Sequence, residues 1–184
     1  GCHEDKNEAL SPGASTITLA QRNGVQKLTP FHGPARGFSY PREIQPIWDA
    51  HCIECHTGGT DADGEALPES LLGNSSSVEN GGRDFSESYI YLTQEGKPNE
   101  LVNWLNVQSQ PPMLAPYFAG AEKSRIMTLL REGHYDVELS RRELELIACW
   151  IDLLVPYSAD YDEDVRWNER QHDEYAYYLT KRNL

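Results

Sequence analysis

Residues 39–56 read SYPREIQPIWDAHCIECH, and in this stretch a helix signal leads directly into a cluster of cysteine and histidine. Four side chains recur at helical spacing: Ile44, Ile47, Trp48 and His51. Pro41 suits the first turn of a helix, whereas Pro46 predicts a kink because proline removes a backbone hydrogen bond. The stretch therefore predicts an amphipathic helix that ends in the motif C-x-x-C-H.

Cys52, Cys55 and His56 match the motif through which c-type haem is attached. In this motif two thiols add to the vinyl groups of the haem, and the adjacent histidine can ligate the iron. A zinc site needs four ligands, and the other cysteines, Cys2 and Cys149, are lone and distant. A thioredoxin-like redox pair needs a βαβ setting, which is absent. The pattern predicts one haem c per chain, with His56 as the proximal ligand.

Most of the chain after residue 38 shows helical patterns. The predicted helices have apolar stripes, capping residues or glycine and proline stops, and cover residues 86–95, 98–106, 121–132 and 140–155. In the tail, residues 162–184, aromatic side chains among charges predict a face that packs on the body. No segment shows the alternation typical of a strand. The sequence predicts an all-α, cytochrome c-like haem domain with long irregular loops.

The first 38 residues differ in composition from the rest. They lack helical periodicity and contain scattered proline, glycine, serine and threonine, which predicts an extended N-terminal arm or linker before a haem domain at 39–184. Gly1, Cys2 and His3 look like the last three residues of a preceding C-x-x-C-H motif, and so like the remnant of another haem site. A lipoprotein cleavage site and a tag-derived glycine are the alternatives.

The charge and the apolar runs limit the classes of partner. The 184 residues include 16 Lys and Arg against 29 Asp and Glu, a formal net charge of −13. This acidity argues against nucleic acid as a binding partner. Its main interpretation is a solvated surface, although it would also favour a basic redox partner through salt-sensitive attraction. No apolar run reaches the length of a membrane span, and the best one, LIACWIDLLVPY, is interrupted by Asp152.

Two residues are the main candidates for a second, distal ligand of the haem iron. Met113 lies in QPPMLAP, where prolines stiffen the loop, and His134 lies in a short turn between Gly133 and the capping residue Ser140. Both residue types ligate haem iron, so the residues alone leave the choice open. Candidates with less support are Met127, in an apolar helical stripe, and His32, His51 and His172.

Two further features have simpler interpretations. Asp61, Asp63 and Glu65, in TDADGE, fit part of a calcium loop, but the required later glutamate is not placed. Calcium is therefore a second candidate cofactor, and a solvated acidic turn is the favoured interpretation. Cys149, in the middle of a predicted helix, is expected to be a small buried apolar residue.

Three segments of the chain resemble the haem-bearing C-terminal region of proteins related to the hydrazine synthase alpha subunit. They are GCHEDKNEA at 1–9, FSYPREIQPIWDAHCIECH at 38–56 and LLREGHYDVELSRRELELIACWIDLLVPY at 129–157. The most specific parts are the C-x-x-C-H helix and the G-H-x-x-V-x-L-S turn before the W-I-D helix. In that family the haem at this position has two histidine ligands, which implies His134 rather than Met113 as the distal ligand.

The resemblance does not imply hydrazine synthase activity. The catalytic haem of that family belongs to the preceding C-x-x-C-H site, which uses a tyrosine four residues past its histidine, and Asn7 stands at that place here. We therefore expect a domain without catalytic activity of its own.

The predicted function is electron transfer by a six-coordinate haem c in the C-terminal module of a larger redox protein. The alternative is a catalytic or ligand-sensing haem domain with an open iron position, and a third possibility is a purely structural haem. Since haem c is attached outside the cytoplasm, we expect a periplasmic or otherwise exported bacterial protein. The expected partners are a redox protein, basic if charge guides the encounter, and other domains of the parent protein.

Overall fold

The computed structural model describes residues 22–74, 83–94, 101–104, 115–163 and 167–182. By its internal contacts the chain divides into two units, Gly1–Ala35 and Arg36–Leu184. In the first unit the described residues, 22–35, are almost all exposed. The second unit contains the candidate site.

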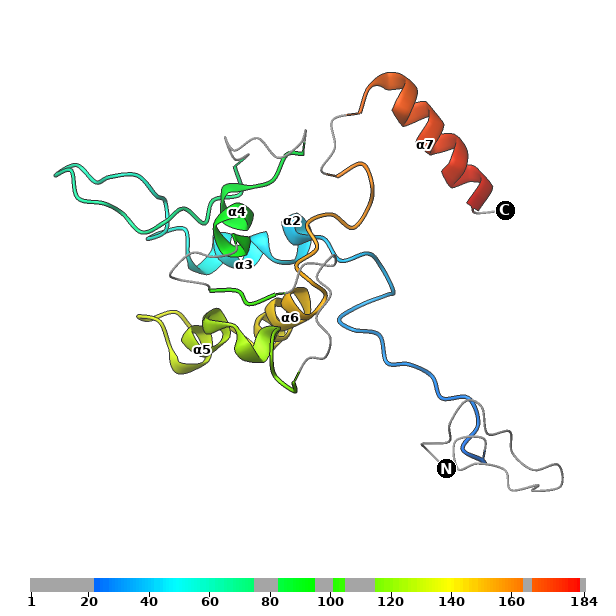
Figure 1. Ribbon diagram of the computed structural model, residues 1–184, viewed down its shortest axis with the longest axis horizontal. Helices are drawn as coiled ribbons and strands as arrows, with labels where there is room; N and C mark the ends of the chain where they lie inside the picture. The colour runs from blue at the N-terminus through cyan, green and yellow to red at the C-terminus, as the bar shows by residue number, and fades with distance from the viewer. Residues whose placement is uncertain (1–21, 75–82, 95–100, 105–114, 164–166, 183–184) are drawn as a thin grey trace. The chain divides into compact units, whose positions relative to one another are not determined.

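The described part of the second unit is all-α, as predicted. Its described helices are α2 (Tyr40–Glu43), α3 (Gln45–His51), α4 (Glu87–Thr93), the short 3-10 helix η1 (Ala121–Lys123), α5 (Arg125–Glu132), α6 (Arg141–Asp152) and α7 (Glu169–Arg182) (Figure 1). The described residues include no strand, and isolated bridges join Thr60 to Ala66 and His134 to Val137. None of the described helices is long and apolar enough to cross a lipid bilayer.

The predicted helix before the C-x-x-C-H motif is divided in two. Ser39 caps α2, since its hydroxyl accepts a hydrogen bond from the Arg42 N–H at 3.4 Å. Instead of the kink predicted at Pro46, the structure has a break at Ile44, and Pro46 lies in the first turn of α3. There a missing N–H costs least, because the first N–H groups of a helix have no partner within it. Cys52 follows as the C-cap of α3.

Capping chemistry also sets the ends of the later helices. The Ser86 hydroxyl accepts from the Tyr89 N–H at the start of α4. The predicted capping box at Ser140 is confirmed: Glu143 accepts from the Ser140 N–H at 2.7 Å, and the Ser140 hydroxyl accepts from the Glu143 N–H. Gly133 ends α5 with a φ of 98°, a conformation that glycine adopts without strain.

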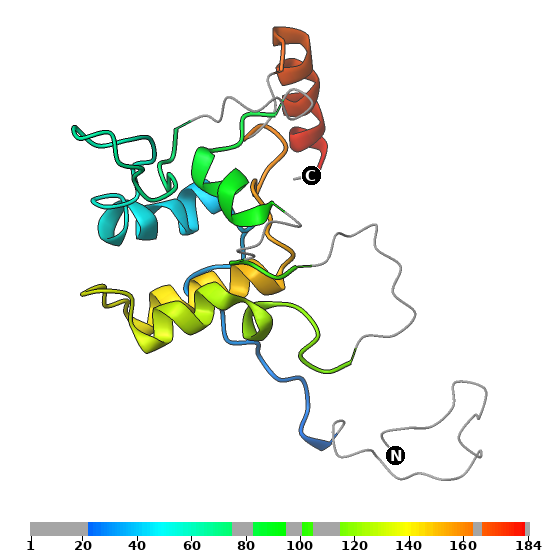
Figure 2. The ribbon, with the colours of Figure 1, turned by 60° about the vertical axis from the view of Figure 1, so that its left-hand side comes forward.

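The hydrophobic core joins α2 and α3 to α5 and α6. Its fully buried apolar side chains are Trp48, Trp150, Tyr40, Ile44, Met127, Ile147, Ile151 and Val155. Figure 2 shows α5 and α6 side by side, as does Figure 1. Within the core the Trp48 indole N–H donates to the Tyr40 hydroxyl at 3.0 Å. The core therefore fixes α3, which leads to Cys52, and α5, which leads to His134.

The helix predicted at 98–106 is wrong for its described residues, 101–104, which are not helical. Their backbone groups bond to the segment around the start of α5 instead. The Ile126 N–H donates to the Leu101 carbonyl at 2.9 Å, and the Asn103 N–H donates to the Ser124 hydroxyl at 2.8 Å. These tertiary bonds replace the bonds that a local helix would make. The remaining residues of the predicted helix lie outside the described residues.

The predicted packing of the tail on the body is also wrong for α7, because none of its described residues is buried. Its aromatic side chains pack on local neighbours. The rings of Trp167 and Tyr175 meet edge to face with centroids 5.0 Å apart, and the Tyr175 hydroxyl donates to the Asp160 carboxylate.

Candidate functional site

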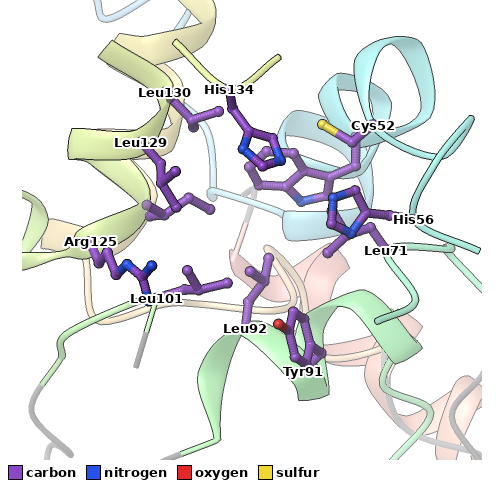
Figure 3. Close-up of a pocket in the computed structure, with 12 residues that line it drawn as sticks. Cys52, His56, Leu71, Tyr91, Leu92, Leu101, Arg125, Leu129, Leu130 and His134 are labelled. Atoms are coloured by element: carbon purple, nitrogen blue, oxygen red, sulfur yellow. The ribbon is translucent and has the colours of Figure 1, made fainter. Parts of the chain in front are cut away.

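An apolar pocket of about 270 Å³ lies among residues from α3, α4 and α5 and the segments that follow them (Figure 3). Its lining residues are Trp48, Cys52, His56, Leu71, Tyr91, Leu92, Leu101, Arg125, Ile126, Leu129, Leu130 and His134. The volume is close to the lower end of the range for small-molecule sites, about 300 Å³. The pocket combines mainly apolar walls with two imidazoles, which is an arrangement suited to an apolar cofactor that contains a metal.

His56 and His134 approach one another in this pocket (Figure 3). Their ring centroids are 6.1 Å apart, and the ring planes are inclined by 40°. The two residues are far apart in the sequence and belong to different structural segments. The fold therefore brings together the two histidines that the sequence analysis named as iron ligands.

His56 is oriented by the segment that contains Glu69 and Leu71. The Leu71 N–H donates to the His56 carbonyl at 2.9 Å, and the His56 Nδ1 lies 3.1 Å from the Glu69 carbonyl oxygen. A carbonyl only accepts, so Nδ1 is the donor of this bond and carries the proton. In the neutral imidazole this leaves Nε2 available for a metal, as in histidine ligands that donate to a carbonyl from their other nitrogen.

His134 is held in a tight turn between α5 and α6. Its carbonyl accepts from the Val137 N–H at 3.2 Å, and Tyr135 has a φ of 51°, in the left-handed region. The Tyr135 ring lies edge-on to the imidazole, with centroids 4.9 Å apart, and Tyr135 is 91% exposed. The ends of α5 and α6 on either side of the turn are fixed by Gly133 and Ser140.

The separation of the imidazoles fits one metal ion between them. A metal–imidazole bond is about 2 Å long, and the ligating nitrogen lies about 1.1 Å from the ring centroid, so two opposed ligands have centroids about 6 Å apart. The observed 6.1 Å agrees with this value. His56 and His134 would supply two nitrogen ligands to a haem iron, and the mainly apolar walls would suit the haem ring. Among the described residues, no group of three or more His, Cys, Asp and Glu is arranged to hold a metal ion.

The two motif cysteines differ in exposure, and both are free thiols. Cys52 is half-buried and lines the pocket, whereas Cys55 is exposed and is not among the lining residues. Burial, and then the neighbouring Cys55, raises the pKa of the Cys52 thiol to about 11. Zinc binding and thiol exchange both need the thiolate, which this burial disfavours. A thioether sulfur has no charge and suits the position.

The structure gives the other iron-ligand candidates different surroundings. His51 pairs with Glu143 through Nε2 and Oε1, 3.0 Å apart. Met127 is 1% exposed in the core, and His172 is exposed beside the Trp167 ring. His32 lies in the first unit, with its ring edge-on to Phe31. Met113 lies outside the described residues, as do Cys2 and His3.

The acidic segment 60–65 forms a turn that its own side chain stabilises. The Asp61 carboxylate accepts from the Asp63 N–H at 3.0 Å and from the Glu65 N–H at 2.9 Å. This capping accounts for Asp61 without a calcium ion, and Asp63 and Glu65 are exposed. Cys149, expected to be buried, is half-buried on α6, and burial raises the pKa of its thiol.

Several pocket residues were not identified from the sequence. Leu129 and Leu130 lie within the helix predicted at 121–132, but no sequence pattern assigns them, or Leu71, Tyr91 and Arg125, to the site. An arginine at the start of an amphipathic helix gives no signal that separates a pocket residue from a surface residue. Their roles become visible only when α4 and α5 are placed around His56.

Comparisons with models of known protein families, with curated proteins and with solved structures found no match. The interpretation of the pocket therefore depends on its residues and their geometry.

Proposed function

We propose that residues 39–184 form a cytochrome c-like domain that binds one haem c and transfers single electrons. The observation that carries the proposal is the pair of imidazoles, His56 and His134, with centroids 6.1 Å apart in an apolar pocket. Cys52 and Cys55 are the covalent attachment points, His56 is the proximal ligand and His134 is the distal ligand. When bound, the haem supplies a one-electron Fe(III)/Fe(II) couple.

The surroundings of the two histidines support electron transfer over catalysis at the iron. A catalytic or ligand-sensing site needs an open coordination position, and the 6.1 Å separation of the His56 and His134 ring centroids supports His134 as the group that would fill it. The turn that contains His134 is bounded by the end of α5 and the capping box of α6, which limits its movement away from His56. The leucines that line the pocket make its walls mainly apolar, and a low-dielectric setting tunes the potential of a redox couple.

The context of the domain is part of the same proposal. The C-x-x-C-H motif implies haem attachment outside the cytoplasm, so the protein is exported, and the resemblance to the hydrazine synthase alpha subunit region makes it the C-terminal module of a larger redox protein. The formal net charge of −13 favours a basic redox protein as the electron partner. The domain needs no catalytic activity of its own for this role.

The test is covalent retention of haem after expression with the haem c attachment machinery. The wild-type protein should retain haem through acid–organic extraction and denaturing electrophoresis, because thioether bonds survive both. The Cys52→Ala/Cys55→Ala variant should lose it. Cys149→Ala, which removes a half-buried thiol outside the pocket lining, is the matched control and should retain haem. Release of free haem from the wild type, or equal retention by the double variant, contradicts the proposal.

A further inference from the structure

Arg125 and Tyr91 lie at the part of the pocket away from Cys52 (Figure 3). Among the described residues that line the pocket, Arg125 is the only lysine or arginine, and most of the others are apolar. Arg125 is exposed and Tyr91 is half-buried. A guanidinium beside a leucine-lined cavity is suited to an anionic group at the edge of an otherwise apolar ligand.

The backbone around Arg125 is fixed by hydrogen bonds. Arg125 is the first residue of α5 and follows Ser124, which is 1% exposed. The Ser124 hydroxyl donates to the Gly120 carbonyl at 2.8 Å and accepts from the Asn103 N–H at 2.8 Å. The next N–H, that of Ile126, donates to the Leu101 carbonyl. These bonds hold the start of α5 at the pocket, so the position of Arg125 does not depend on a free loop.

The charges near Arg125 also affect Tyr91. Burial raises the pKa of the Tyr91 phenol, the Glu69 carboxylate adds to this effect, and the Arg125 guanidinium opposes it. Glu69 is exposed, and its carboxylate would repel a second anion at this edge. Arg125 is the group that would offset that repulsion, and the Tyr91 hydroxyl can donate a hydrogen bond.

Haem has chemically different edges. The vinyl carbons that bond to cysteine lie toward one side of the ring, and two propionate carboxylates lie toward the other. Attachment at Cys52 would therefore direct the propionates toward the part of the pocket that contains Arg125 and Tyr91. Resting on the proposed haem function, we propose that Arg125, with the Tyr91 hydroxyl near it, forms the binding subsite for a haem propionate. Guanidinium binds a carboxylate through two parallel hydrogen bonds, which a lysine cannot reproduce.

The test compares haem-loaded full-length chains by potentiometric titration at several pH values. The variants are Arg125→Gln, Arg125→Lys and, as the matched control, Arg131→Gln, which removes the same charge from the same helix outside the pocket lining. Loss of Arg125 leaves the propionate charge unopposed and stabilises the ferric state. For charges about 10 Å apart at an effective dielectric constant of about 20, the ferric-to-ferrous ratio at fixed potential should rise about tenfold. That change equals a midpoint potential about 59 mV lower.

The pH profile gives a second readout. In the wild type we expect the potential to change less between about pH 5 and 7 than in Arg125→Gln, because the paired propionate stays ionised in both oxidation states. In Arg125→Gln the unpaired carboxyl should titrate in this range, so the potential should fall as pH rises. Arg125→Lys should lie between the two, and Arg131→Gln should match the wild type. The other titratable groups near this edge, Glu69, Tyr91, His56 and His134, are unchanged in all four proteins.

The outcomes separate this subsite from the proposed function. If Arg125→Gln retains covalent, six-coordinate haem with the wild-type potential and pH profile, the subsite is refuted and the haem function stands. A wild-type potential that falls between about pH 5 and 7 as steeply as that of Arg125→Gln, or as that of Arg125→Lys if the glutamine variant binds no haem, also refutes the subsite. If the wild type contains no covalent haem, the proposed function and this inference are refuted together.

Discussion

Gln45 is the buried polar side chain that connects α3 to the segment orienting His56. It is 6% exposed, its amide nitrogen donates to the Leu71 carbonyl at 2.9 Å, and its amide oxygen accepts from the Ser88 hydroxyl at 2.6 Å. Leu71 in turn donates its N–H to the His56 carbonyl. We therefore predict that Gln45→Leu destabilises the domain and loosens the surroundings of His56.

The size of the effect follows from the groups that lose their partner. Leucine fills a similar volume but leaves the Leu71 carbonyl without the Gln45 donor, and a buried polar group without a partner costs about 1–3 kcal/mol. For the Ser88 hydroxyl the loss of the Gln45 acceptor costs less free energy, because the Ser86 hydroxyl lies 3.0 Å from it and provides another partner. We expect a loss of about 2 kcal/mol in unfolding free energy. For a domain of this size the melting temperature should fall by about 4–8 °C.

The assay is urea denaturation, in which the midpoint should fall while the slope stays unchanged. Ser88→Ala is the companion variant. The Gln45→Leu/Ser88→Ala double variant should cost less than the sum of the two single variants, because they share one hydrogen bond. A Gln45→Leu protein within about 0.5 kcal/mol of the wild type would show that this contact does not hold the segment 69–71.

Three further predictions concern a cap, a glycine and the surface charge. The Ser140 hydrogen bonds lower the pKa of Glu143, and a carboxylate with a lowered pKa in the folded state stabilises the fold above its ordinary pKa of 4.5. Glu143→Gln should therefore lose about 0.5 kcal/mol of unfolding free energy at pH 7, and this loss should vanish in urea titrations as pH falls below 4.5. A difference from the wild type that does not change with pH would contradict the prediction. Gly120→Ala should lower the unfolding free energy by about 1–3 kcal/mol more than Gly59→Ala does. Both glycines have a positive φ, but the new Cβ at Gly120 would lie 2.5 Å from Asp152 Oδ1, whereas the one at Gly59 would meet no atom within 4 Å. Equal melting temperatures of the two variants would contradict the prediction. Electron exchange with a basic redox protein should slow steeply as the salt concentration rises, because the chain has a net charge of −13. Stopped-flow rates that do not depend on ionic strength would show that this charge does not guide the encounter.

The helix ends were predictable because local chemistry determines them. Ser140 and Glu143 satisfy each other's backbone donors whatever packs on the helix, and the capping box is present as predicted. Pro46 likewise acts on its own backbone, so a disturbed helix was expected and a break at Ile44 is observed. Leu101 and Asn103 were different, since their backbone partners are Ile126 and Ser124, more than twenty residues away. Such distant hydrogen bonds leave no local pattern.

The candidate site, too, could be predicted from the sequence only in part. His56 is part of a motif of fixed spacing, so the sequence was enough to name it. His134 was named from its place between two helix ends and from a resemblance, whereas its 6.1 Å approach to His56 depends on how α3 and α5 pack in the core. Arg125 and Tyr91 were not named, because nothing near either residue in the sequence indicates a shared cavity.

Ligation of the haem iron by two histidines can be measured in the optical spectrum of the purified protein, oxidised and reduced, with and without carbon monoxide. If His56 and His134 are both axial ligands, the wild type should be low-spin in both states and should not bind carbon monoxide. His134→Ala should open the iron and bind the gas, whereas Met113→Ala should match the wild type. Carbon monoxide binding by the wild type, or a long-wavelength iron–sulfur band that Met113→Ala abolishes, would contradict ligation by the two histidines.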